Sequence, residues 1–143
     1  MSGYKKLLVL LDLSQDSEQV AVAGRTQAEH SNASMVALHV VEFVPVEPMG
    51  ESLMPTVQIE EELIRRSRAK LNELTVRLGL QGAAPRVEAG NIKAEILRVA
   101  DEEGADLIVV GSRERHGLAI LVNFTEDALL HAARCDVLAV RLR

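Results

Sequence analysis

Aromatic residues are almost missing from this sequence, which contains no tryptophan and only Tyr4, Phe43 and Phe124. Modules that read single-stranded nucleic acid stack the bases on aromatic rings, and this chain has too few rings for that. Its formal net charge of -5 is also unfavourable, since phosphate backbones are bound through clustered lysine and arginine. We therefore expect no nucleic-acid partner.

Long apolar runs are missing as well. The run that follows Lys5 and Lys6 ends at Asp12, which makes it shorter than the roughly 7–15 residues of a signal-peptide core. No stretch approaches the ~18 apolar residues of a membrane span. A single cysteine, Cys135, excludes an internal disulfide and suits a reducing compartment. We expect a cytoplasmic protein without a membrane partner, in which Cys135 is a small buried residue.

Short aliphatic runs make up much of what is present. A chain of 143 residues with 48% hydrophobic content is the size of one domain, which we take to span residues 1–143. Nearly continuous Val, Leu and Ile is typical of strands covered on both faces, as in a parallel sheet. One of the runs, Arg86–Ala89, is less apolar and is placed by its position between two helical patterns. The expected strands are Lys6–Leu11, Met35–Val41, Arg86–Ala89, Leu107–Val110 and Val137–Leu142.

Helical patterns separate these strands. The first is expected from an N-cap at Ser14 to about His30, and the third from Asn91 to Gly104. The second should bury one face and end at Gly79; its inward residues are Ile59, Leu63, Leu71, Leu74 and Leu78. The fourth should cover 118–133 and bury Leu121, Ala128, Leu129 and Ala132. This alternation predicts a doubly wound α/β fold with helices on both faces of a parallel sheet.

The one long irregular stretch covers residues 43–56 and contains Pro45, Pro48 and Pro55. A loop of this length is either functional or a plain surface excursion, and the sequence leaves both interpretations open.

In an open α/β sheet, ligands bind beyond the carboxyl ends of the strands where the strand order reverses. Here that point lies between the first and fourth strands, whose tips are Asp12-Leu13-Ser14 and the loop Gly111–Gly117. Neither tip carries a glycine-rich dinucleotide fingerprint or a P-loop. Nothing pairs a nucleophile with a base, and no Cys/His cluster has metal-ligand spacing. We expect neither an enzyme nor a metal site, and we interpret His39 as a satisfied, half-buried strand residue.

Several segments carry a resemblance to a known family. They are Tyr4–Ser14, Ala37–Val40, Asp106–Ser112, Arg115–Leu118, Leu130-His131 and Cys135–Arg141. In this order along the whole chain they resemble the universal stress protein family, most strongly its single-domain A-like type. The resemblance implies a Rossmann-like, five-stranded parallel sheet of order 3-2-1-4-5. It also implies a homodimer joined along the last strand, Val137–Leu142.

The family divides into members that bind ATP and members that do not. The binders carry G-x2-G-x9-G-[ST], in which glycines let backbone amides approach the phosphates. Gly111 matches the first glycine, while Glu114 takes the place of the second. The third falls on Phe124-Thr125 or, aligned from Cys135, on Asn123-Phe124.

These departures disfavour ATP. A carboxylate about 5 Å from a phosphate charge costs on the order of 3 kcal/mol at an effective dielectric near 20, which is roughly a hundredfold in affinity. Phe124 puts bulk where the motif needs bare backbone. Arg113, Arg115 and His116 could attract an anion, but we interpret Arg113-Glu114-Arg115 as a solvated surface cluster.

We therefore expect a non-enzymatic stress-response or regulatory homodimer with an unidentified protein partner and no required cofactor. Its nucleotide site, vestigial in this interpretation, comprises Asp12, Val40, Gly111, Ser112, Arg115 and Thr125. The resemblance gives Asp12 the role of accepting from the adenine amino group and Val40 that of packing on the ring. An alternative role for Asp12 is to accept hydrogen bonds from backbone amides near a helix start. The alternative function is an ATP-dependent switch that uses the same residues.

Overall fold

In the computed structural model, residues 3–42, 54–80, 82–112, 129 and 131–142 are described, with the side chains of 54–58 left aside. The strands are β1 (Lys6–Leu10), β2 (Ser34–Glu42), β3 (Ala84–Gly90), β4 (Leu107–Ser112) and β5 (Asp136–Arg141). The helices are α1 (Ser17–Ser31), α2 (Met54–Arg77) and α3 (Ile92–Glu103).

The five strands form one parallel sheet of order β3-β2-β1-β4-β5, as the family resemblance implied. At its centre, Leu7 of β1 lies between Met35 of β2 and Leu107 of β4. β4 is longer than expected, because Gly111 and Ser112 pair with Val140 and Arg141 of β5. Both residues were expected in the loop and belong instead to the strand.

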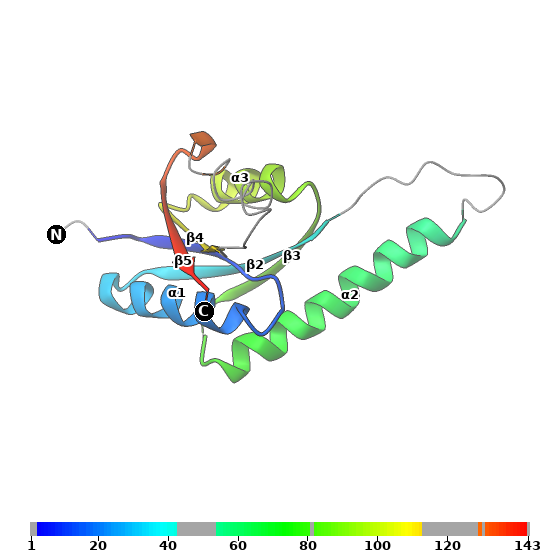
Figure 1. Ribbon diagram of the computed structural model, residues 1–143, viewed down its shortest axis with the longest axis horizontal. Helices are drawn as coiled ribbons and strands as arrows, with labels where there is room; N and C mark the ends of the chain where they lie inside the picture. Colours follow the sequence, from blue (N-terminus) through cyan, green and yellow to red (C-terminus); the bar gives the residue numbers. More distant parts are fainter. Residues whose placement is uncertain (1–2, 43–53, 81, 113–128, 130, 143) are drawn as a thin grey trace, which may run out of the picture.

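Helices cover both faces of the sheet, α3 on one side and α1 with α2 on the other (Figure 1). Successive strand residues point to opposite faces, so β1 divides its side chains between two cores. Leu7 and Val9 join Val20 of α1 and Leu71 of α2. Leu8 joins Ile96 of α3. Burial on both faces explains why the strands are aliphatic without alternation.

The first helix begins at Ser17, so the prediction of an N-cap at Ser14 was wrong. Ser14 lies one turn earlier, where its carbonyl accepts from the Ser17 amide at 3.1 Å. Its hydroxyl donates to the Asp12 carboxylate and accepts from the Asp16 amide, at 2.6 and 3.2 Å. Ser14 therefore closes a turn before the helix.

The second helix differs from prediction at its start. It begins at Met54, so residues 54–56, expected to be irregular, are helical. Pro55 is compatible with this because the first turn of a helix needs no amide donor. Leu71 and Leu74 are buried as expected, but Ile59 and Leu63 are 56% and 46% exposed. Their predicted burial was wrong, because this half of the helix runs past the sheet (Figure 1).

The third helix was predicted correctly. The Asn91 side chain accepts from the Ala94 amide at 2.9 Å, and Gly104 ends the helix with φ of 67°. Of the fourth predicted helix, residues 113–128 and 130 lie outside the described residues. Leu129 is helical and fully buried against α3, as expected. Ala132 is exposed, contrary to expectation, because it lies in the last helical turn before β5. None of the helices in the described part is long and apolar enough to span a membrane.

Candidate functional site

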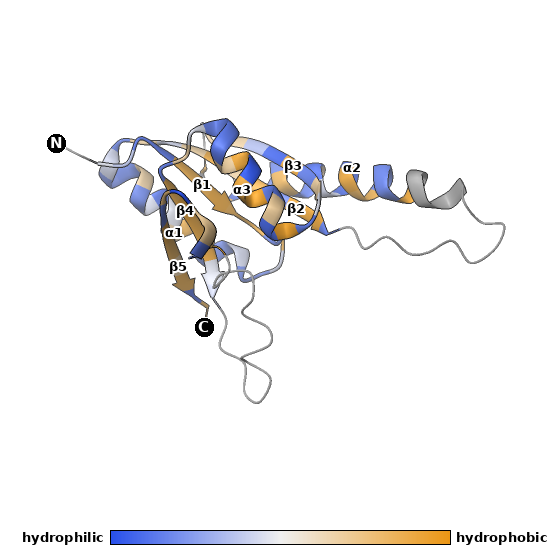
Figure 2. Cartoon of the chain, turned by 90° about the horizontal axis from the view of Figure 1, so that it is seen from above, coloured by the Kyte–Doolittle hydropathy of each residue, from blue (hydrophilic) through white to orange (hydrophobic). Residues whose placement is uncertain are grey.

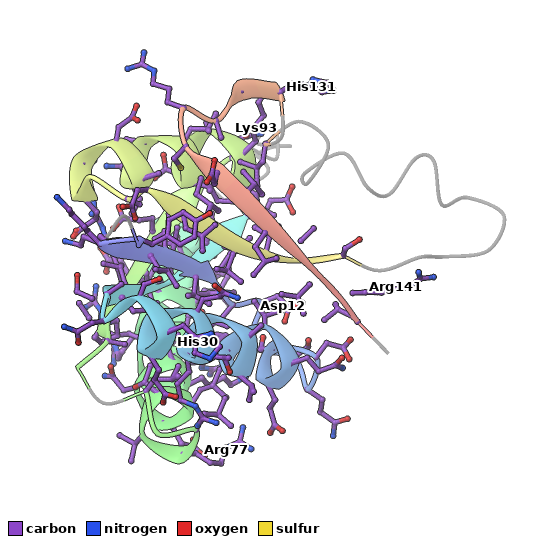
Figure 3. All side chains as sticks on the ribbon, turned by 90° about the vertical axis from the view of Figure 1, so that its left-hand side faces the viewer. Asp12, His30, Arg77, Lys93, His131 and Arg141 are labelled. Carbon is purple, nitrogen blue, oxygen red and sulfur yellow. The ribbon has the colours of Figure 1, made fainter. Side chains whose placement is uncertain are left out.

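The candidate site lies where the strand order reverses, at the carboxyl ends of β1 and β4. Because these strands are parallel neighbours, Asp12 after β1 and Ser112 at the end of β4 lie on the same edge of the sheet. Arg141, which pairs with Ser112, ends β5 on this edge (Figure 3). The two strand tips that the sequence analysis singled out therefore lie on one edge of the sheet.

One carboxylate oxygen of Asp12 organises the turn into α1. Asp12 Oδ1 accepts from the Ser14 amide at 2.9 Å, the Ser14 hydroxyl at 2.6 Å and the Ser17 hydroxyl at 2.7 Å. This supports the structural role considered for Asp12, with two serine hydroxyls added to the expected backbone amide. Among the described residues, Asp12 Oδ2 receives no hydrogen bond, and the side chain is exposed.

The Asp12 carboxyl is held ionised. Partial desolvation raises its pKa, but the hydrogen bonds from Ser14 and Ser17 and the nearby His39 outweigh that effect, so the pKa lies below its ordinary value. Asp12 is thus a hydrogen-bond acceptor over the whole physiological range. An ionised acceptor at this edge suits an amino or hydroxyl donor on a ligand.

The residue after Asp12 has unusual backbone geometry. Leu13 has φ of 66°, a left-handed conformation that is uncommon for a residue other than glycine, asparagine or aspartate. Such positions cost on the order of 1–3 kcal/mol and gather at functional sites. The turn holds Asp12 above the sheet edge while the Leu13 side chain packs against the core.

His39 supports the same turn from β2. Its Nδ1 lies 2.7 Å from the Leu11 carbonyl oxygen, so Nδ1 carries the proton and donates. The ring is half-buried, and the prediction of a satisfied strand histidine is confirmed. His39 thereby ties the residue that follows β1 to β2.

Gly111 has a packing role that its motif position did not suggest. A Cβ on Gly111 would lie 3.1 Å from Leu142 Cδ1 and 3.1 Å from Val20 Cγ2. Contacts of this length are tighter than nine in ten real Cβ contacts, so both side chains would have to shift by a few tenths of an ångström. The glycine therefore lets α1 and the residue after β5 approach β4, whatever the site binds.

Of the other predicted site residues, some are described by the structure and some lie outside the described residues. Val40 is buried to 6% exposure in the core beside α3, near the end of β2. Arg115 and Thr125 lie outside the described residues, as do Glu114 and Phe124, so their roles stay predictions. No group of three or more His, Cys, Asp or Glu side chains in the described part of the chain could hold a metal ion.

Two residues have roles in this turn that the sequence analysis did not predict. Ser17 is 1% exposed and fixes Asp12 from the first turn of α1, and Leu13 carries the left-handed bend. The signal for Ser14 was available, because a serine two residues after an aspartate is typical of an Asx turn. No local sequence pattern predicts a leucine with a positive φ angle.

The sheet order and the polar turn beyond β1 define a doubly wound α/β protein. Its turn lies at the topological switch point, which is where open α/β sheets bind ligands. The family model of the universal stress protein family matches residues 3–141, and the chain belongs to that family. It is 34% identical over 144 residues to universal stress protein A homolog 2 of Coxiella burnetii, covering 100% of this chain and 99% of that protein.

Solved structures agree on the fold. The universal stress protein UspA from Lactobacillus plantarum superposes with a TM-score of 0.82 at 21% identity, over 99% of this chain and 100% of that one. A universal stress protein solved in complex with cAMP superposes with a TM-score of 0.66 at 22% identity, over 97% and 98%. These likenesses concern the fold.

Proposed function

We propose that this universal stress protein is a non-enzymatic regulatory homodimer, paired through β5, that binds ATP weakly or not at all and acts through a protein partner. The observation that carries the proposal is the open edge of β5. Among the described residues this strand pairs with β4 alone, and Val137, Leu138 and Val140 are half-buried in the single chain. An apolar edge strand is usually covered in the functional protein.

The direction of the backbone donors in β5 gives a test. Leu142 donates its amide to the Ser112 carbonyl of β4 at 2.8 Å. Since successive amides along a strand point to opposite sides, the Arg141 amide points to the open edge. Arg141→Pro therefore removes an edge donor and leaves the β4 pairing intact, and should disrupt the dimer.

Sedimentation at micromolar concentration checks this. We expect a dimer for the wild type and a folded monomer for Arg141→Pro. Leu142→Pro is the control, because it removes the hydrogen bond to β4 and should lower stability instead. A wild-type monomer would overturn the proposed dimer, as would a dimer in Arg141→Pro that is as tight as that of the wild type.

The expectation of weak ATP binding rests on the sequence, where Glu114 and Phe124 replace the glycines of the binding motif. The packing of Gly111 is compatible with this, because an added Cβ would press on Leu142 and Val20 and the glycine therefore has a structural use without a phosphate. Titration calorimetry with Mg-ATP should show no binding tighter than about 1 mM. Micromolar binding would refute this part of the proposal.

The second candidate is an ATP-dependent switch built on Asp12, Val40, the Gly111–Gly117 loop and Thr125. Its supporting observation is the exposed, ionised Asp12 with Oδ2 unused by the described residues. The solved relative in complex with cAMP makes a nucleotide a reasonable ligand class to test. Mass spectrometry of the gently purified protein should reveal a retained nucleotide if this candidate is correct, and none if the first proposal holds.

A further inference from the structure

The sheet has a second edge strand, β3, whose chemistry differs from that of β5. Between Asp136 and Arg141, β5 holds four uncharged residues, and Figure 2 shows it as a mainly hydrophobic strand. β3 lies at the opposite end of the strand order, where it pairs with β2 alone among the described residues, and it carries Arg86 and Glu88. An edge strand offers backbone groups to another chain, and these two edges offer them in different surroundings.

Pro85 removes a hydrogen-bond donor from the β3 edge. The register of β3 with β2 is unbroken from Ala84 to Gly90, and a proline is accommodated in such a strand with its nitrogen toward the open side. Since alternate residues point to the same side, the outward backbone positions are those of Pro85, Val87 and Ala89. The first of these three positions has no N–H to give.

A cluster of charged residues covers the α3 side of the same edge. Arg86 Nε donates to Glu88 Oε2 at 3.0 Å, and Arg98 of α3 donates to Glu88 Oε1 at 2.7 Å. Arg86 also donates to Glu102 at 2.9 Å, and Arg98 to Glu95 at 2.7 Å. We call these five residues the β3 edge cluster. Both oxygens of Glu88 are used within it, so the cluster is complete without a ligand or a further strand.

A strand added to β3 would lie beside this cluster. Side chains on neighbouring strands have Cβ atoms about 4.5–5.5 Å apart, so an added strand would take water away from Arg86 and Glu88. The side chains of these two residues are 24% and 25% exposed. Desolvating ion pairs that already have their partners costs free energy, and the apolar residues of β5 would offer them no hydrogen bond in return. Contact between β5 of one copy and β3 of another is therefore disfavoured.

We propose that Pro85 and the β3 edge cluster close the β3 edge to strand addition, so that assembly of this chain stops at two copies. A contact between two β5 strands uses the same patch on both copies and closes the assembly. A contact between β5 and β3 is head-to-tail and can continue as a filament. The inference rests on the proposed β5 dimer for the number of copies, but the closure of β3 can be tested without that dimer.

An open-edge variant, Pro85→Val/Arg86→Thr/Glu88→Val, restores the donor and replaces the charges by residues that favour strands. Sedimentation velocity from about 10 μM to about 500 μM covers the range in which weak contacts form. We expect the wild type to remain a dimer throughout and the open-edge variant to form larger species as its concentration rises. Arg98→Gln is the matched control, because it weakens the cluster from α3, leaves the β3 residues in place and should remain a dimer.

Far-UV circular dichroism checks that each variant is folded. Pro85→Val, which restores only the donor, is the milder variant if the triple substitution lowers the helix content, and it too should form species larger than a dimer. A folded open-edge variant that remains a dimer at every concentration would overturn the proposal. Species larger than a dimer in the wild type would overturn it as well.

The Arg141→Pro background separates this proposal from the β5 dimer. With β5 pairing removed, the protein with the natural β3 edge should remain a monomer. The open-edge variant in the same background should pair through β3, with a dissociation constant at least about tenfold lower than that of its parent. Equal association of the two proteins would overturn the closure of β3. A monomeric wild type beside an associating open-edge variant would instead refute the β5 dimer and leave the closure of β3 supported.

Discussion

Gly24 marks the closest approach between a helix and the sheet. A Cβ built on Gly24 would lie 2.7 Å from Val9 Cγ2 and 3.3 Å from Val9 Cγ1, both on the fully buried Val9 of β1. Met35 Sδ would be 3.6 Å away. Carbon atoms do not approach to 2.7 Å without repulsion, so Gly24→Ala must move α1 away from β1 or rotate Val9.

Two effects of opposite sign determine the cost. Alanine is favoured over glycine inside a helix by about 1 kcal/mol. Inserting a methyl group into a closely packed core costs typically about 1–3 kcal/mol. The clash is with the branched γ-carbons of a buried valine, which have few alternative rotamers, so the upper part of that range applies. We expect Gly24→Ala to lower the free energy of unfolding by about 1–2 kcal/mol.

Urea unfolding at fixed protein concentration measures this change, and an unaltered denaturant slope would show that the unfolded state is comparable. Gln27→Gly and Gln27→Ala, compared with each other, report the glycine-to-alanine difference in helix propensity at another position of α1. The Val9→Ala/Gly24→Ala pair completes a double-mutant cycle. Removing the valine γ-carbons should make Gly24→Ala neutral or stabilising in that background, with a coupling of about 1–3 kcal/mol. A stabilised single variant, or additive effects, would refute the packing argument.

Three further substitutions or conditions test other parts of the molecule. The Asp106 carboxylate accepts hydrogen bonds from the Lys5 and Lys6 amides at 2.8 and 3.0 Å, and the side-chain amide of an asparagine can accept only one of them. Asp106→Asn should therefore lower the free energy of unfolding in urea by about 1–3 kcal/mol. A change below about 0.5 kcal/mol would contradict this. Desolvation raises the pKa of Glu88, but the hydrogen bonds from Arg86 and Arg98 outweigh it and the pKa lies below the ordinary 4.5. A carboxyl group with a lowered pKa in the folded state stabilises the fold above about pH 4.5, and this stabilisation is lost as the pH falls through the folded-state pKa. The urea concentration at the unfolding midpoint should therefore decrease from pH 5 to pH 3, and it should decrease less steeply in Arg98→Gln. Equal slopes in both proteins would remove this interpretation. The pKa of the Cys135 thiol is raised, mainly by partial burial and further by the charges of Asp136 and Asp106. Iodoacetamide should therefore modify this thiol more slowly in the native protein than in urea at the same pH. Equal rates would contradict the packing of Cys135 beside α3.

The sheet could be predicted because its signal is local. β1, β2 and β4 are buried on both faces, which requires continuous aliphatic sequence, and such runs are visible without a structure. β3 is an edge strand and carries Arg86 and Glu88, which form ion pairs with each other and with α3. Because of these charged residues β3 lacks the hydrophobic pattern of a buried strand, and it was predicted only from its position between two helices.

What could not be predicted depends on contacts between distant residues. The end of β4 is set by β5, since Gly111 and Ser112 become strand residues only by pairing with Val140 and Arg141. The exposure of Ile59 depends on where the sheet stops beneath α2, and helical periodicity cannot show that. Similarly, the serine spacing after Asp12 suggested a helix start, because a turn and an N-cap use the same residue type.

The position of Gly111 determines which substitution best tests nucleotide binding. Its match to the first motif glycine counted as evidence for a phosphate site, yet the close packing of Leu142 and Val20 gives this glycine a structural use as well. Gly111→Ala would displace these side chains, so a loss of binding in this variant would not separate a phosphate contact from a change in packing. Asp12→Asn is the sharper variant, because the amide can still accept from Ser14 and Ser17 through one oxygen. It replaces the exposed acceptor by a donor, so a ligand amino group would be rejected while the turn persists. Loss of nucleotide binding with unchanged stability would place a ligand at Asp12, whereas loss of stability alone would make its role structural.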